Sequence, residues 1–247
     1  MNFSQFHTEP FILKVSKGKV NGHSTDHKFG AVPAMSQNQT GSIWDVNDTN
    51  YPWSAFSSAS IINVATVNSS DDGKTITVVG LDANYNEQTE NIVVSDSSSV
   101  NSTKTFIRVY RAFMHDTSAV NVANINIRVN TTVVARITAG QGQTLMAVYT
   151  VPAGYTAYIV KKTCTCQANA DATVGLYTRT FGENSFRVKH SFEVSGEGGQ
   201  YLYDSIPTKV TEKSDIDFIA TVRTNNARLT AAFDILLVNN LFIGQER

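Results

Sequence analysis

Apolar and polar residues alternate with a period of two along most of this chain, and β-branched residues are frequent within the alternating runs. Successive side chains of a strand point to opposite faces, so this pattern predicts strands that are buried on one side. Clusters of Gly, Asn, Asp and Ser separate the runs and predict turns. Strands are predicted at residues 11–15, 75–79, 88–94, 106–111, 124–129, 133–138, 144–150, 157–167, 172–180, 186–194, 217–224 and 228–238.

Many short strands with few helical segments predict an all-β fold with two β-sandwich-like domains of the jelly-roll type. We expect an N-terminal arm with the first strand at residues 1–53, a first β domain at 54–132 that includes part of the arm, and a second at 133–247. The arm is expected because residues 20–53 show little alternation, and long segments without periodicity often mediate interactions.

Two local patterns add detail to this fold. Asp72-Gly73 lies between two strand-like runs, and both residues tolerate positive φ, so the pair predicts a hairpin turn. The run at residues 231–238 is apolar on both faces around Asp234, which is typical of a central or covered strand. The C-terminal segment is therefore expected to pack within the fold or against another subunit.

Composition and charge exclude several classes of function. Of the 247 residues, 41% are hydrophobic and only 17% are charged, and the formal net charge is −1. Without a basic patch, counterion release gives no basis for nucleic-acid binding. No run reaches the roughly 18 apolar residues of a membrane helix, and the N-terminus does not resemble a secretory signal. We therefore expect synthesis in a cytoplasm without export.

Motifs that would indicate chemistry are incomplete. The segment that begins at Asp82, Asn84 and Asn86 imitates a calcium loop, but the required Gly is missing and Val93 stands where the final Glu should be. We interpret it as a polar loop whose side chains cap their own backbone. The sequence also lacks a Gly-x-Ser-x-Gly elbow and a phosphate-binding loop.

The cysteines and histidines do not predict a metal site. Cys164 and Cys166 would point to the same side of one strand, too far apart for an easy disulfide and too few for zinc. His23 and His27 are interpreted as exposed or interface residues of the arm, since glycines bracket their segment and a helix is not expected. We predict no catalytic residue, no cofactor and no metal, and hence no enzyme.

Several stretches together resemble a family of virion structural proteins of tailed bacteriophages, of the type found in phages of marine bacteria and cyanobacteria. The stretches are residues 17–24 (KGKVNGHS), 27–30 (HKFG), 43–45 (IWD), 80–87 (GLDANYNE), 106–112 (FIRVYRA) and 147–159 (AVYTVPAGYTAYI). They span roughly residues 10–160 in the order of the family. The resemblance implies a particle component that is made in the host cytoplasm and incorporated into virions.

A structural role implies assembly through subunit contacts, as a tail- or baseplate-associated accessory protein or as a capsid decoration protein. The expected partners are other virion proteins and further copies of the chain, with a trimer as the expected form. Candidate interface residues are Phe29, Trp44, Tyr51, Trp53, Arg108, Arg111 and Phe242. The alternative is a receptor- or glycan-binding module of a phage fibre, which would present exposed aromatic residues to a host-surface glycan.

Overall fold

A computed structural model describes residues 9–46, 48–115, 120–196 and 198–243. The elements, in chain order, are α1 (Phe11–Ser16), β1 (His23–Met35), β2 (Thr40–Ser42), η1 (Trp53–Phe56), β3 (Ser60–Ala65), η2 (Ser69–Asp71), β4 (Thr75–Leu81), β5 (Glu87–Val93), β6 (Val100–Phe106), β7 (Arg108–Met114), β8 (Ile125–Val129), β9 (Thr132–Ile137), β10 (Val148–Thr150), β11 (Tyr155–Cys166), β12 (Asp171–Arg179), β13 (Arg187–Ser195), β14 (Gly199–Val210), β15 (Asp215–Val222), β16 (Ala227–Asn239) and η3 (Asn240–Phe242). The named strands pair antiparallel, which confirms the all-β, sandwich-like prediction.

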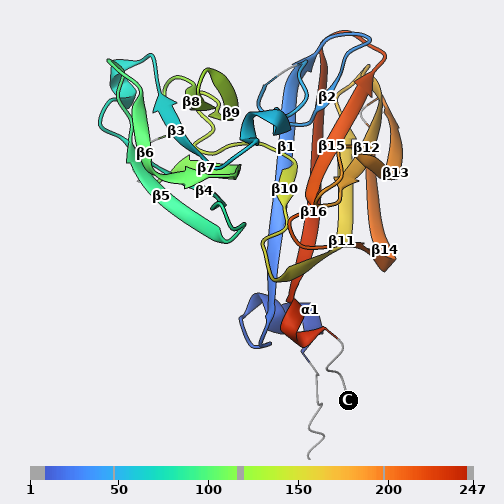
Figure 1. Ribbon diagram of the computed structural model, residues 1–247. Helices are drawn as coiled ribbons and strands as arrows, with labels where there is room; N and C mark the ends of the chain where they lie inside the picture. The colour runs from blue at the N-terminus through green and yellow to red at the C-terminus, as the bar shows by residue number, and fades with distance from the viewer. Residues whose placement is uncertain (1–8, 47, 116–119, 197, 244–247) are drawn as a thin grey trace, which may run out of the picture.

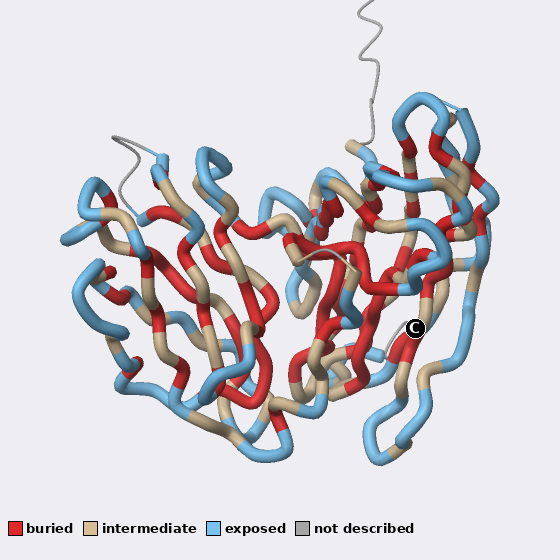
Figure 2. Tube along the Cα trace, turned by 90° about the horizontal axis from the view of Figure 1, so that it is seen from above, coloured by how far each residue is buried: buried red, intermediate tan, exposed pale blue. Residues whose placement is uncertain are grey.

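The strands form four sheets in two groups that lie side by side (Figure 1). The first group, here called the sandwich, has one sheet in the order β1-β16-β11-β14 and another in the order β10-β15-β12-β13, with β2 paired to β15. The second group, the insert, has sheets in the orders β6-β3-β8-β9 and β5-β4-β7. In both groups buried stretches lie along the strands, and exposed stretches gather in loops and in edge strands such as β5 and β14 (Figure 2).

Strand pairing departs from the expected division of the chain at 53 and 132. The segment expected as an arm contributes β1, which pairs along its length with β16 from the far end of the sequence. At the other boundary β9 pairs with β8 and so belongs to the insert. The insert therefore interrupts the sandwich in sequence. Independent folding of the two groups and the jelly-roll connectivity stay predictions.

The pattern missed β1 because the inward-facing positions of this strand are not uniformly apolar. Lys28 points inward and is buried, and Gly30 is required by a close approach. A Cβ atom at Gly30 would lie 2.3 Å from the carbonyl oxygen of Ile43 and from the amide nitrogen of Ala147. β14 was missed for another reason: it is a mostly exposed edge strand that bulges between Tyr203 and Thr208, so it shows no alternation.

Two local predictions were wrong. Residues 11–15 form the helix α1 instead of a strand, and the amides of Leu13 and Lys14 donate to the carbonyl of Pro10. A run this short does not distinguish helix from strand, whereas proline suits a helix start. Gly73 adopts the expected positive φ of 76°, but the flanking strands β3 and β4 lie in different sheets, so the turn is not a β-hairpin.

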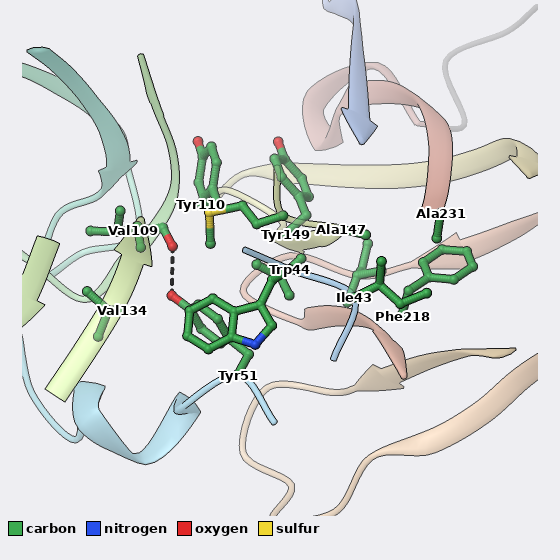
Figure 3. Packing of buried hydrophobic residues seen from close by; sticks show 14 of the residues in the cluster. Ile43, Trp44, Tyr51, Val109, Tyr110, Val134, Ala147, Tyr149, Phe218 and Ala231 are labelled. Atoms are coloured by element: carbon green, nitrogen blue, oxygen red, sulfur yellow. Dashed lines mark hydrogen bonds between the residues drawn. The ribbon is translucent and has the colours of Figure 1, made fainter. Parts of the chain in front are cut away.

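The sandwich and the insert share one continuous hydrophobic core. At their junction the rings of Trp44 and Tyr51 meet edge to face at 5.3 Å between centroids, and the Tyr51 hydroxyl donates to the carbonyl of Val109 at 2.7 Å (Figure 3). Tyr110 of β7 and Tyr149 of β10 lie 4.9 Å apart across the same junction. Because the contacts join residues from both groups, neither group buries this surface alone.

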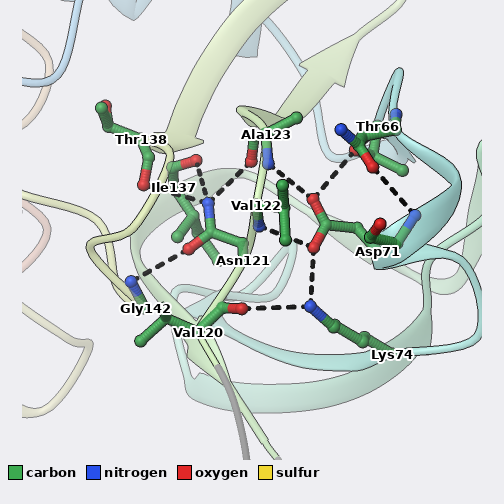
Figure 4. Close-up of polar contacts among 12 residues, drawn as sticks. Thr66, Asp71, Lys74, Val120, Asn121, Val122, Ala123, Ile137, Thr138 and Gly142 are labelled. Atoms are coloured by element: carbon green, nitrogen blue, oxygen red, sulfur yellow. Dashed lines mark hydrogen bonds and ion pairs between the residues drawn. The ribbon is translucent and has the colours of Figure 1, made fainter.

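One buried carboxylate fixes a loop of the insert (Figure 4). Asp71 accepts hydrogen bonds from the backbone amides of Val122 and Ala123 at 2.8 and 2.7 Å, and Lys74 Nζ lies 2.8 Å away. Beside it, the Asn121 side chain donates to three backbone carbonyls and accepts from the amide of Gly142. Although it lies in a turn, Asp71 is therefore not solvated, and it ties the loop to η2.

Substituting Asp71→Ala is expected to lower the free energy of unfolding by roughly 2–4 kcal/mol, because two amides and the Lys74 charge lose their partner. The neighbouring exposed Asp72→Ala is a matched control with an expected change of about 0.5 kcal/mol or less. Urea unfolding measures both variants. Equal losses would mean that the buried carboxylate is not what stabilises the loop.

Candidate binding groove

Three of the predicted interface residues lie inside the chain. Trp44, Tyr51 and Arg108 are buried, so they have no surface for another subunit. The sequence did not reveal the burial of Trp44 and Tyr51, because large aromatic residues occur in cores and in interfaces alike. Trp53 is half-buried and packs against the core, with its Nε1 donating to Asp217 at 2.9 Å. These four side chains hold the junction between the sandwich and the insert together.

Arg108 belongs to a buried charge network that links the insert to the sandwich. Its Nε and Nη2 donate to the two carboxylate oxygens of Asp215 at 2.9 and 3.1 Å. Arg179 donates to the same carboxylate at 2.6 Å, and so does the Thr150 hydroxyl. Both guanidinium groups lie over the Trp53 ring, at 5.5 and 5.6 Å from its centroid. Asp215 therefore pairs with two arginines from different strands.

The remaining predicted residues, Phe29, Arg111 and Phe242, are at least partly accessible. Phe29 and Arg111 line a groove of about 1040 Å³ that lies between the β1-β16-β11-β14 sheet, β7 of the insert and α1. The volume of this groove is at the upper end for ligand sites. Phe242 lies elsewhere, next to the start of β1.

Paired charges line the groove. Arg111 Nη2 lies 2.9 Å from Asp26, and His27 Nδ1 lies 2.5 Å from Asp234. Lys161 Nζ lies 3.8 Å from the other oxygen of Asp234. Each carboxylate thus has a basic neighbour, and the local charge is close to balanced. The side chains of these pairs are partly accessible, which leaves hydrogen-bonding capacity directed to solvent.

A more deeply buried polar cluster lies beside these pairs. Lys28 Nζ donates to the carbonyl of Tyr110 and lies 5.1 Å from the centroid of the Tyr110 ring. Burial, together with the charge of the nearby Arg111, lowers the pKa of Lys28 to about 7. The buried Tyr149 hydroxyl has no hydrogen-bond partner among the described residues, and burial raises its pKa. Lys28 is therefore poised to change charge near neutral pH.

The loop at Asp82 has the self-capping structure that was predicted. The Asp82 carboxylate accepts from the backbone amides of Asn84 and Asn86 at 2.8 and 2.9 Å, and also from the Asn86 side chain. Within the described residues no group of three or more His, Cys, Asp or Glu side chains is arranged to hold a metal ion. No helix in that part of the chain has the length and apolar character to cross a membrane.

An apolar surface occupies one end of the sandwich, where the described N- and C-terminal segments meet (Figure 1). It consists of six exposed apolar side chains: Phe11, Ile12, Leu13, Leu241, Phe242 and Ile243. The Phe242 ring covers Gly22, where an added Cβ would lie 2.3 Å from Cδ2, and the Phe11 ring meets His23 edge to face. We call this surface the apolar end.

No protein-family model matches the chain, and no curated protein is significantly similar to it in sequence. Among solved structures, that of the infectious bursal disease virus Gx strain gives a TM-score of 0.23 at 11% identity, covering 96% of this chain and 78% of that one. T=1 particles derived from infectious bursal virus give 0.24 at 8% identity, with 89% and 70% covered. The VP2 subviral particle of that virus gives 0.21 at 8%, with 91% and 74% covered. Scores of this size do not establish a shared fold.

Proposed function

We propose that the chain is a non-enzymatic structural subunit of a tailed-bacteriophage particle, either tail- or baseplate-associated or a capsid decoration protein, and that it assembles with copies of itself. The apolar end carries this proposal. Its six apolar side chains are all exposed, with Leu241 at 74%, and the Phe242 ring packs on Gly22 of the N-terminal segment. Contiguous apolar patches on soluble proteins mark contact sites. The resemblance of residues 10–160 to virion proteins supports the same conclusion.

A second copy is the proposed occupant of the apolar end. Both the first described helix and the last described turn contribute to it, so one contact between copies would secure both segments of each chain. Closed symmetry repeats such a contact, and a particle multiplies weak contacts into stable attachment. Phe242 is the predicted interface residue that lies in this contact, whereas Trp44, Tyr51 and Arg108 support it only by holding the fold together.

Light scattering after size-exclusion chromatography tests the assembly. The wild-type protein is expected as a discrete oligomer, a trimer at three times the 27.0 kDa of one chain. Leu241→Asp is expected to raise the dissociation constant by roughly a hundredfold or more, because a charge without a partner would be buried in the contact. Val67→Asp is the matched control, since Val67 is 87% exposed and lies in the insert.

A wild-type monomer at micromolar concentration would contradict self-assembly. Equal dissociation of the Leu241→Asp and Val67→Asp variants would contradict the assignment of the contact to the apolar end. Circular dichroism of both variants establishes that the sheets remain folded.

A further inference from the structure

One row of side chains crosses the whole outer face of the β1-β16-β11-β14 sheet within the groove. The strand register places His27 opposite Asp234, Asp234 opposite Lys161, and Lys161 opposite Tyr203. Residues opposite each other in antiparallel strands point to the same face, so the four side chains form a continuous row. At about 4.8 Å between strands the row is about 14 Å long.

The polar part of this row is neutral overall but not fully hydrogen-bonded. Asp234 is held by His27 at 2.5 Å on one oxygen, whereas Lys161 is 3.8 Å from the other, beyond ordinary hydrogen-bond distance. A ligand hydroxyl could therefore accept from Lys161 and donate to Asp234 without separating the charges. A charged ligand would have to displace one member of the pair, which disfavours anions and cations alike.

The aromatic end of the row is open. Tyr203 is 72% exposed although Lys161 Nζ lies over its ring at 5.6 Å from the centroid, and Phe29 on the next row is 40% exposed. Exposed rings beside neutral polar groups suit ligands with alternating apolar and hydroxyl-bearing faces, as sugar rings have. On the opposite side Arg111 and Phe113 of the insert form a wall.

We propose that this groove binds a neutral oligosaccharide, with Tyr203 as the stacking platform and with Asp234, Lys161 and His27 as hydrogen-bonding partners of the hydroxyl groups. The volume of about 1040 Å³ accommodates several sugar units. The row of four side chains uses no residue of the apolar end, although Ile12 and Leu13 of α1 border both surfaces. It assigns a glycan as the ligand, and a peptide or a second copy in the groove becomes an outcome of the test.

Titration calorimetry with maltohexaose, cellohexaose and N-acetylchitohexaose tests the site. At least one of the three is expected to bind, and Tyr203→Ala is expected to weaken that binding at least tenfold. Tyr201→Ala is the matched control: Tyr201 is 70% exposed, lies two residues away on the same strand face and is not among the residues lining the groove. Its affinity should stay within about twofold of wild type.

Three results would overturn the proposal. These are the absence of binding by all three hexasaccharides, an equal loss of affinity in both tyrosine variants, and a change of oligomeric mass in Tyr203→Ala, which would make the groove a subunit contact. A wild-type oligomer that binds none of the sugars would overturn only the glycan site, and a monomer that binds one would overturn only the assembly.

Discussion

Asp215→Ala is expected to lower the free energy of unfolding by roughly 3–5 kcal/mol, the usual cost of leaving a buried charge without its partner. Asp215 is almost fully buried and accepts hydrogen bonds from Arg108, Arg179 and Thr150. Its removal leaves the buried Arg108 guanidinium with backbone carbonyls as its remaining hydrogen-bond acceptors. Since Arg108 belongs to the insert, the loss should also weaken the attachment of the insert to the sandwich. Urea unfolding measures the change.

An exposed pair of the same chemistry provides the control. Arg223 lies 2.6 Å from Asp171 at the surface of the sandwich, so Asp171→Ala is expected to change the free energy of unfolding far less than Asp215→Ala. The double variant Arg108→Met with Asp215→Ala should recover part of the loss relative to Asp215→Ala alone, because it removes the unpaired charge. Similar costs for the buried and the exposed pair would refute the role given to Asp215.

The free energy of unfolding is expected to pass through a minimum near pH 7. Burial raises the pKa of Asp45 to about 7, and burial and the neighbouring Asp215 raise the pKa of Asp217 to about 7. From about pH 4 to 7 these carboxyls remain protonated when folded but ionise when unfolded, so stability falls as pH rises. Burial lowers the pKa of Lys28 to about 7, so from about pH 7 to 9 stability rises.

Each of these pKa differences corresponds to about 4 kcal/mol at most over its window. Two other groups change the free energy of unfolding in the opposite direction. Burial lowers the pKa of His190, so its contribution to stability rises with pH on the acidic side. Burial raises the pKa of Cys164 to about 12, so its contribution falls with pH on the alkaline side. Variants therefore isolate each contribution. The free energy of unfolding of the wild type minus that of Asp45→Asn should fall between about pH 4 and 7. The free energy of unfolding of the wild type minus that of Lys28→Met should rise between about pH 7 and 9.

Urea unfolding at several pH values from about 4 to 9 provides both difference curves. A difference curve that does not change with pH would show that the group in question has the same ionisation in the folded and unfolded chain. Lys28 belongs to β1, lines the groove and donates a hydrogen bond to the Tyr110 carbonyl of the insert. The Lys28 difference curve therefore also depends on how well this contact keeps water away from the ammonium group.

Fold class and many strands could be predicted from the sequence because the backbone period of two is a local property. β12 shows its buried positions mainly as alternation, whereas β4 and β16 are buried over most of their length and are visible as apolar runs. Turn residues were local too: Gly73 adopts the predicted positive φ, at 76°. The capping of the Asp82 loop follows from side chains that reach only their own backbone.

The candidate groove could be predicted only in part. Phe29 and Arg111 were singled out and do line it, and Asp234 was noted as the polar interruption of an apolar strand. Lys161 and Tyr203 gave no signal, because a partly exposed lysine and an exposed tyrosine are ordinary residues on the solvent-facing side of a sheet. Conversely, Trp44 and Arg108 were predicted at an interface but are buried within the chain. Their burial depends on contacts between the sandwich and the insert, which no local pattern predicts.

The sequence by itself determined that this protein is built of half-buried strands joined by polar turns, since each of those features rests on neighbouring residues. Only the tertiary structure decided that β1 pairs with β16, that Arg108 meets Asp215, and that His27, Asp234, Lys161 and Tyr203 form one row. Contacts across such distances along the chain depend on strand register, which the packing of the whole core fixes and no local pattern records.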